Sequence, residues 1–134
     1  MRQTLLALIL AAVILPATAA ESLTPGKTVN AVLKASDRSN DRGGRSHDYT
    51  LQLKQDQIVL VTAKSEDFDA VVLVFGPDGD HLAENDDHES GSTNAALIMT
   101  APQTGSYTVR VNSLPMGDGH VGAYSVRAIV FSED

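Results

Sequence analysis

Two acidic stretches of this sequence carry the oxygen donors that a hard metal cation needs. The first covers residues 35–46 and the start of the apolar stretch that follows, and it contains Asp37, Asn40, Asp41 and Asp48. Calcium takes six to eight oxygen ligands from carboxylates, amide side chains and backbone carbonyls. Asp37, Asp41 and Asp48 are therefore the first prediction for a calcium site.

The second acidic stretch runs from Glu66 to Glu89 and holds nine of the seventeen acidic residues of the chain. Its candidate calcium ligands are Asp78, Asp80, Asn85, Asp86 and Asp87. Asp and Asn are also common in turns, where their side chains bond to the local backbone. Both stretches therefore have two interpretations, a calcium site or an ordinary polar loop.

Other chemistry finds less support in the residue spacing. His81 and His88 with Asp86 match no standard transition-metal motif. Ser92, His88 and Asp86 could form a triad on paper, but one short acidic loop cannot hold a nucleophile against its base. The sequence also contains no Cys, which excludes thiol catalysis and cysteine-bound zinc. We therefore predict a protein that is not an enzyme.

The N-terminus has the layout of a secretory signal peptide. A basic start at Arg2 precedes an unbroken apolar run over residues 5–15, and small residues follow up to Ala20. The run is shorter than the roughly 20 residues that a transmembrane helix needs. We expect residues 1–20 to be removed after Ala19 or Ala20, leaving a periplasmic or extracellular protein without membrane insertion.

The remaining residues, 21–134, are enough for a single domain. The formal net charge of the whole sequence is −7, and such a surface repels phosphate backbones. Nucleic acid is therefore not an expected partner. An exported chain without cysteines suits the periplasm, although it gives no indication of the oligomeric state.

The elements that must position the acidic stretches are short strands. Residues 47–53 alternate between apolar and polar types, and residues 57–63 and 70–75 are nearly continuous apolar runs, as expected for strands buried on both faces. Further strands are expected at residues 27–33, 80–83 and 94–100, with a turn at Pro77, Asp78 and Gly79. The chain is therefore predicted to be all-β, a jelly-roll-like antiparallel β-sandwich of about eight short strands.

A six-residue pattern occurs twice near the end of the chain. Gly105-Ser-Tyr-Thr-Val-Arg and Gly122-Ala-Tyr-Ser-Val-Arg differ at two positions. Both predict a strand with the tyrosine, Tyr107 or Tyr124, on the inward row. A tyrosine near the start of a strand often bonds back to the backbone at a sandwich corner. Because Tyr49 is also expected inward and the chain has no Trp, a carbohydrate site is not favoured.

The order of these motifs resembles the bacterial pre-peptidase C-terminal domain over residues 27–131. The matching parts are Asp48-Tyr49-Thr50-Leu51, Asp67-Phe68-Asp69, residues 71–75, Pro77-Asp78-Gly79, Asn85-Asp86-Asp87 and the two Gly-x-Tyr segments. The resemblance implies a non-catalytic β-sandwich that is usually appended to secreted peptidases. Some domains of this family bind collagen or other insoluble substrates, and some bind calcium. Here the domain would be a free-standing copy.

We therefore expect an exported, non-catalytic binding module for a protein or for an extracellular-matrix or cell-surface ligand, with calcium as a possible stabilising ion. The alternative is an accessory or inhibitory partner of a separately encoded secreted peptidase.

Overall fold

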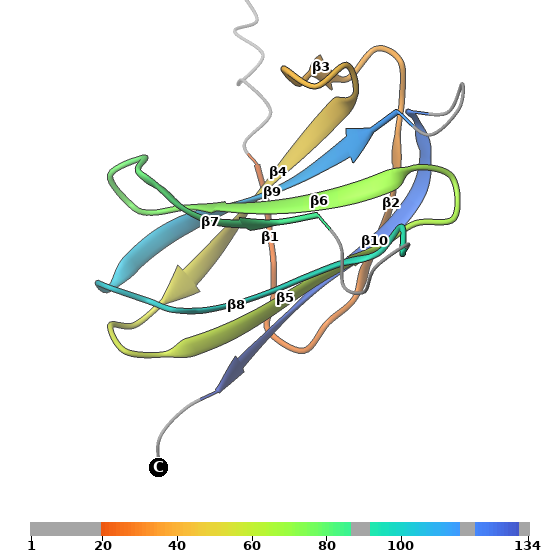
Figure 1. Ribbon diagram of the computed structural model, residues 1–134. Helices are drawn as coiled ribbons and strands as arrows, with labels where there is room; N and C mark the ends of the chain where they lie inside the picture. Colours follow the sequence, from red (N-terminus) through yellow and green to blue (C-terminus); the bar gives the residue numbers. More distant parts are fainter. Residues whose placement is uncertain (1–19, 87–91, 116–119, 132–134) are drawn as a thin grey trace, which may run out of the picture.

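The computed structural model describes residues 20–86, 92–115 and 120–131, which form two sheets packed face to face (Figure 1). The strands are β1 (Glu21–Ser22), β2 (Val29–Leu33), β3 (Arg38–Ser39), β4 (Arg45–Leu53), β5 (Ile58–Lys64), β6 (Asp69–Phe75), β7 (His81–Asn85), β8 (Ala95–Thr100), β9 (Gly105–Leu114) and β10 (Gly122–Phe131). The predicted signal peptide lies outside the described residues except for Ala20. Within the described ranges, no helix has the length and apolar character needed to cross a membrane.

The first sheet, called sheet A, has the strand order β1-β4-β9-β6-β7, and β3 pairs with β4 outside this path. The second, called sheet B, has the order β2-β10-β5-β8. The strand pairs are antiparallel, apart from β1, which runs parallel to β4. The all-β antiparallel sandwich predicted from the sequence is confirmed. The described strands of five or more residues match the number expected, and β1 and β3 add two short ones.

The core lies between the sheets and is built from alternate residues of the central strands. The inward rows are Tyr49, Leu51 and Leu53 of β4, Val59, Val61 and Ala63 of β5, Tyr107, Val109 and Val111 of β9, and Tyr124, Val126 and Ala128 of β10. Full burial of a Val or Leu side chain stabilises the fold by about 1.5–3 kcal/mol. The alternation predicted for residues 47–53 and for the two final strands is confirmed.

Strands β5 and β6 differ in a way that the sequence did not predict. Residues 70–74 of β6 are all buried, as expected for a strand covered on both faces. The same prediction for residues 57–63 is wrong, because β5 alternates and Ile58 is 41% exposed. The surroundings of the two strands differ, because residues 38–41 line a shared hollow with Leu73 and Phe75 on the outer side of β6. Apolar composition alone cannot separate a covered strand from an uncovered one.

The two copies of the repeated pattern occupy central strands of different sheets, β9 in sheet A and β10 in sheet B. The Tyr107 hydroxyl donates to the Gln103 carbonyl at 2.5 Å and accepts from the Gln103 amide at 3.2 Å, which confirms the corner bond for this copy. The Tyr124 hydroxyl instead contacts Tyr49 and His47. One sequence pattern therefore serves two different purposes.

Candidate functional site

The polar segment over residues 35–46 is held by its own side chains. The Asn40 side-chain amide donates to the carbonyls of Arg45 at 3.0 Å and Ser113 at 2.9 Å. Its oxygen accepts from the backbone amides of Arg42 at 2.9 Å and Gly44 at 3.0 Å. Asn side chains commonly organise turns in this way. Asn40, which the sequence placed among oxygen donors for calcium, instead fixes the turn and ties it to β9.

Gly44 allows this segment to approach β9 closely. A Cβ atom at this position would lie 1.9 Å from the Ser113 carbonyl oxygen, so any larger residue would displace the segment. The Ser113 hydroxyl accepts from the Arg45 amide at 2.9 Å, and the Arg45 guanidinium reaches back to the Ala35 carbonyl at 2.9 Å. The segment is therefore a packed part of the sandwich, and β3 lies within it.

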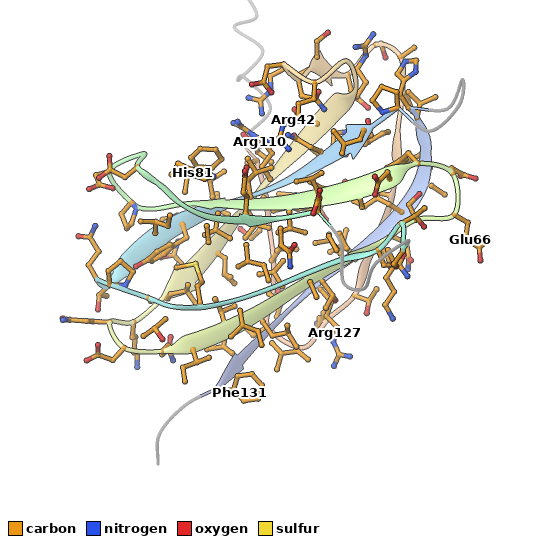
Figure 2. The ribbon with its side chains drawn as sticks, in the orientation of Figure 1. Arg42, Glu66, His81, Arg110, Arg127 and Phe131 are labelled. Atoms are coloured by element: carbon orange, nitrogen blue, oxygen red, sulfur yellow. The ribbon has the colours of Figure 1, made fainter. Side chains whose placement is uncertain are left out.

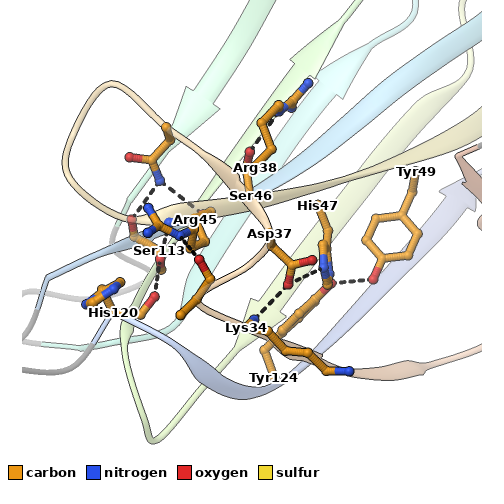
Figure 3. A network of polar contacts seen from close by, with 12 residues as sticks. Lys34, Asp37, Arg38, Arg45, Ser46, His47, Tyr49, Ser113, His120 and Tyr124 are labelled. Carbon is orange, nitrogen blue, oxygen red and sulfur yellow. Dashed lines mark hydrogen bonds and ion pairs between the residues drawn. The ribbon is translucent and has the colours of Figure 1, made fainter. Parts of the chain in front are cut away.

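A chain of polar contacts links this segment to both sheets (Figure 3). Asp37 accepts from the Lys34 amide at 2.7 Å and contacts His47 Nε2 at 2.9 Å. His47 Nδ1 lies 2.7 Å from the Tyr124 hydroxyl, which in turn contacts the Tyr49 hydroxyl. A neutral His47 that donates from Nε2 to Asp37 accepts the Tyr124 proton at Nδ1. The contacts join β4 of sheet A to β10 of sheet B.

The protonation states of this chain follow from burial and hydrogen bonding. Burial raises the pKa of Tyr49, although its hydrogen bond with Tyr124 opposes the shift. Burial, followed by the hydrogen bond with Tyr49, raises the pKa of Tyr124 far above its ordinary value. The hydrogen bond from the Lys34 amide lowers the pKa of Asp37, and His47 lowers it further against the effect of burial. At neutral pH, Asp37 is therefore a carboxylate and both tyrosines are neutral.

Asp48 lies opposite Arg110 on the outer face of sheet A, and Figure 2 labels Arg110. Asp48 Oδ1 accepts from Arg110 Nε at 2.8 Å and from Arg38 Nη2 at 3.0 Å, and Oδ2 accepts from Arg110 Nη2 at 3.1 Å. The Arg110 guanidinium also lies over the Phe75 ring, 4.7 Å from its centroid. Burial alone would raise the pKa of Asp48, but the hydrogen bonds and charges of Arg110 and Arg38 hold it below its ordinary value.

Of the first predicted calcium ligands, Asp37 and Asp48 line one hollow beside β4, but their carboxylates contact different partners. Asp48 faces outward from sheet A and its oxygens accept from two guanidinium groups, whereas Asp37 points toward His47 and Tyr124. Asp41 is exposed in the turn between β3 and β4. Among the described residues, no group of three or more His, Asp or Glu side chains is arranged to hold a metal ion. Calcium at Asp37, Asp41 and Asp48 therefore stays a prediction.

The second predicted set is divided by a strand. Asp78 and Asp80 belong to the turn before β7, where Asp78 Oδ1 accepts from the Asp80 amide at 3.3 Å. Asn85 and Asp86 lie at the other end of that strand, roughly 15 Å away at about 3.3 Å per residue. The Asn85 side chain donates to the Ala96 carbonyl at 2.7 Å. Residues 81–85 form one extended strand between the two halves of the set, and Asp87 lies outside the described residues.

Of the two histidines considered for a transition metal, the structure describes the contacts of His81 only. His81 Nε2 lies 3.5 Å from Glu84, and its ring packs edge-on against Phe75. His88 lies outside the described residues, so the structure does not describe the triad with Ser92 and Asp86.

The outer face of sheet B exposes apolar side chains in neighbouring positions. Ile58 is 41% exposed, Ile98 71% and Phe131 52%, with Leu60 and Ile129 half-buried between them. The strand registers place Phe131 opposite Ile58, and Leu60 between Ile129 and Ile98. These five residues are called the apolar face. Figure 2 shows Phe131 and Arg127 on the side of the sandwich opposite to Arg42 and Arg110.

The charge of sheet B is opposite in sign to that of the whole chain. Its four strands contain no Asp or Glu, and their charged residues are Lys64 and Arg127. A hollow of ≈ 530 Å³ lies at the Lys64 end, where Glu66 and Asp67 of the following turn join Lys64 in its lining. An exposed apolar surface with polar residues around it is typical of a protein-interaction site.

The structure is similar to solved structures from two groups of bacterial proteins. The pre-peptidase C-terminal domain of a collagenase from Bacillus anthracis has a TM-score of 0.58 and 13% identity, over 82% of this chain and 94% of that domain. The fold is that of the pre-peptidase C-terminal domain. The resemblance predicted from the sequence motifs is thereby confirmed at the level of the fold. No protein-family model matches the sequence, and no curated protein matches it.

The second group consists of PliG proteins, periplasmic inhibitors of g-type lysozyme. PliG from Aeromonas hydrophila has a TM-score of 0.56 and 18% identity, over 84% of this chain and the whole of that protein. PliG from Salmonella Typhimurium has a TM-score of 0.55 and 19% identity, over 83% of this chain and 97% of that protein. This chain therefore shares its fold with a domain of a collagenase and with PliG.

Sequence reasoning did not find the features that the structure emphasises. Arg110 and Asp48 are 62 positions apart, and no local motif pairs them. The apolar face draws on three strands, and its residues look like ordinary core positions in the sequence. The signal that could have identified it is the absence of acidic residues from 29–33, 58–64, 95–100 and 122–131 in an otherwise acidic chain.

Proposed function

We propose that this chain is an exported, non-catalytic domain that binds another protein through the outer face of sheet B. The observation that carries the proposal is the apolar face itself, in which Ile58, Ile98 and Phe131 are all more than 40% exposed. Contacting apolar residues in a rigid sheet form a surface that can be buried without large conformational cost.

The charge of this surface indicates the kind of partner. Lys64 and Arg127 are the charged residues of sheet B, so a complementary partner presents apolar residues together with carboxylates. Exposed aromatic and Arg side chains such as Phe131 and Arg127 are frequent among the residues that contribute most to binding. The pre-peptidase fold supports this function because it also occurs as a domain of a collagenase.

The test is affinity capture from envelope and culture-supernatant proteins, using the processed chain and two variants. In the double variant Ile58→Ser and Phe131→Ser, we expect loss of a partner that the wild-type chain retains. Val32→Ser is the control, because Val32 is 51% exposed on β2 but lies outside the apolar face. Equal capture of the same proteins by all three chains would contradict the proposed surface.

A second candidate function is inhibition of a secreted hydrolase. It is supported by the likeness to PliG, which extends over the whole of the Aeromonas hydrophila protein. The alternative expected from the sequence, an accessory or inhibitory partner of a secreted peptidase, belongs to the same class of activity. Assays of g-type lysozyme and of secreted peptidases with a molar excess of this chain test both forms. Undiminished hydrolysis in every assay would remove this candidate and leave the first unaffected.

Calcium remains a prediction that no contact in the described residues supports. Its test is given in the Discussion.

A further inference from the structure

The edge of sheet B formed by β8 (Ala95–Thr100) has an unusual composition. β8 is the last strand of its sheet, and the chain contains no charged residue from Ser90 to Val109. Its pairing with β5 is regular through all six residues. Edge strands of soluble proteins usually carry Lys, Pro or a bulge, or are very short, because unpaired backbone groups invite pairing with another chain.

The other edges of the described sheets have such protection. At the β7 edge, Glu84 pairs with Arg42 at 3.3 Å, and the register with β6 shifts between Val74 and Phe75. The opposite edge of sheet A is formed by the two-residue β1. The β2 edge of sheet B is flanked by Lys27 and Lys34. β8 therefore differs from the rest in having none of these features.

The pairing with β5 shows which residues of β8 direct their backbone N–H and C=O groups toward the open edge. The Ala101 amide donates to the Gln57 carbonyl at 2.8 Å. Backbone direction alternates along a strand, so the N–H and C=O groups of every second residue before Ala101 also point toward β5. The backbone groups of Ala96, Ile98 and Thr100 consequently point away from β5. The bond from Asn85 to the Ala96 carbonyl, at 2.7 Å, agrees with this direction. A carbonyl oxygen has two lone pairs and can accept a second bond.

We propose that β8 pairs antiparallel with β8 of a second copy of this chain, about a two-fold axis at Ile98. The three edge-facing residues are spaced symmetrically around Ile98. One register therefore opposes Ile98 to itself and Ala96 to Thr100 of the second copy. Ile98 is the most exposed large apolar residue in the described part of the chain, at 71%, and it becomes a cross-strand pair with its counterpart.

Charge favours this contact between two copies. Each chain has a net charge of −7, and contact through acidic loops would be repulsive. The β8 strand itself carries no charge, so the paired strands place no like charges directly opposite each other. The pairing joins two four-stranded sheets and places both apolar faces on the same side, as one continuous surface. The dimer thus goes beyond the proposed partner binding and does not depend on it.

Cysteine cross-linking tests the register directly, because the natural chain has no cysteine. In the proposed pair the two Ile98 Cα atoms lie about 5.5 Å apart, within the range that a disulfide bridges. Ile98→Cys is therefore expected to give a covalent dimer under mild oxidation. Val32→Cys, on the opposite edge, and Ile58→Cys, on the apolar face, are expected to stay monomeric. Cross-linking through Ile58→Cys in place of Ile98→Cys would indicate face-to-face packing and overturn the proposal.

Molar mass in solution provides a second test without cross-linking. The processed wild-type chain is expected to have twice the chain mass in light scattering, and Ile98→Lys is expected to have the single mass. Because Ile98 is exposed, this variant should melt as a folded protein, which circular dichroism checks. A wild-type chain that is monomeric at all concentrations, or an Ile98→Lys variant that remains dimeric, would overturn the proposal. So would β8-dependent association with a different protein in place of a second copy.

Discussion

Arg110 holds Asp48 with two parallel hydrogen bonds, from Nε to Oδ1 at 2.8 Å and from Nη2 to Oδ2 at 3.1 Å. The two residues lie opposite each other on adjacent strands, β9 and β4. The Phe75 ring lies under the guanidinium and completes its surroundings. A carboxylate that the sequence suggested as a metal ligand is thus neutralised by a cation of the same chain.

Replacing Asp48 by Asn is expected to destabilise the fold by about 1–3 kcal/mol at neutral pH, because Arg110 loses a charged hydrogen-bond partner in a partly buried position. Urea unfolding measures the change. Asp41→Asn, in the exposed turn of the same segment, is the control and should change stability by less than about 0.5 kcal/mol.

The decrease in the free energy of unfolding at acid pH should also depend on Asp48. The folded-state pKa of Asp48 is lowered, so its contribution is present above the unfolded pKa of about 3.9 and is lost as pH falls through the folded value. The stability difference between wild type and Asp48→Asn should therefore shrink below about pH 4. A difference that stays constant down to acid unfolding would contradict this origin.

Tyr124→Phe is expected to cost about 1–3 kcal/mol, because His47 Nδ1 and the Tyr49 hydroxyl both lose their shared partner. Because the folded-state pKa of Tyr124 is raised, the free energy of unfolding should decrease at high pH. Its contribution is complete below the unfolded pKa of about 10 and is lost as pH rises above it, because only the unfolded chain ionises.

Unfolding free energies at neutral and alkaline pH, with tyrosinate absorbance, check both statements. Wild-type stability should fall above about pH 10, and more steeply than that of Tyr124→Phe. Ionisation of all three tyrosines in the folded protein near pH 10 would contradict the burial of this pair.

Gly44→Ala is expected to destabilise the fold by about 1–3 kcal/mol, because the added methyl group would overlap the Ser113 carbonyl and force the segment over residues 38–44 to move. Thermal or urea unfolding measures the cost. Ser36→Ala, at an exposed position in the same segment, is the matched control. Equal stability of the two variants would show that the approach to Ser113 is not close in solution.

Calcium is expected to leave the melting temperature unchanged, because the carboxylates of Asp37 and Asp48 point to different surroundings and already accept hydrogen bonds. The comparison is a melt with calcium and with a chelator. An ion at 100 times its Kd would add about 2.7 kcal/mol. A shift of this size that Asp37→Asn abolishes would restore the calcium prediction for the first stretch.

The fold could be predicted from the sequence because its determinants are local. Alternation over residues 47–53 and the two Gly-x-Tyr segments each encode a strand and its inward face without reference to the rest of the chain. The candidate sites depend on contacts between distant residues. Asn40 reaches Ser113 and Asp48 reaches Arg110, and composition alone cannot distinguish these partners from a metal ion.

The exposure of β5 was missed for a related reason. Strands β5 and β6 have similar apolar composition, and their burial differs because of what lies over each strand, including residues 38–41 near Leu73 and Phe75 of β6. The edge position of β8 likewise comes from the strand order, which the sequence pattern does not contain.

The uncharged β8 segment also has a consequence before the fold has formed. Ala95 to Thr100 is a short, largely apolar stretch without charge or proline, and such stretches favour aggregation when exposed. In the newly made chain this segment is open until β5 pairs with it. A single lysine in place of Ile98 should therefore increase the yield of soluble protein during overproduction, even where it leaves the melting temperature unchanged.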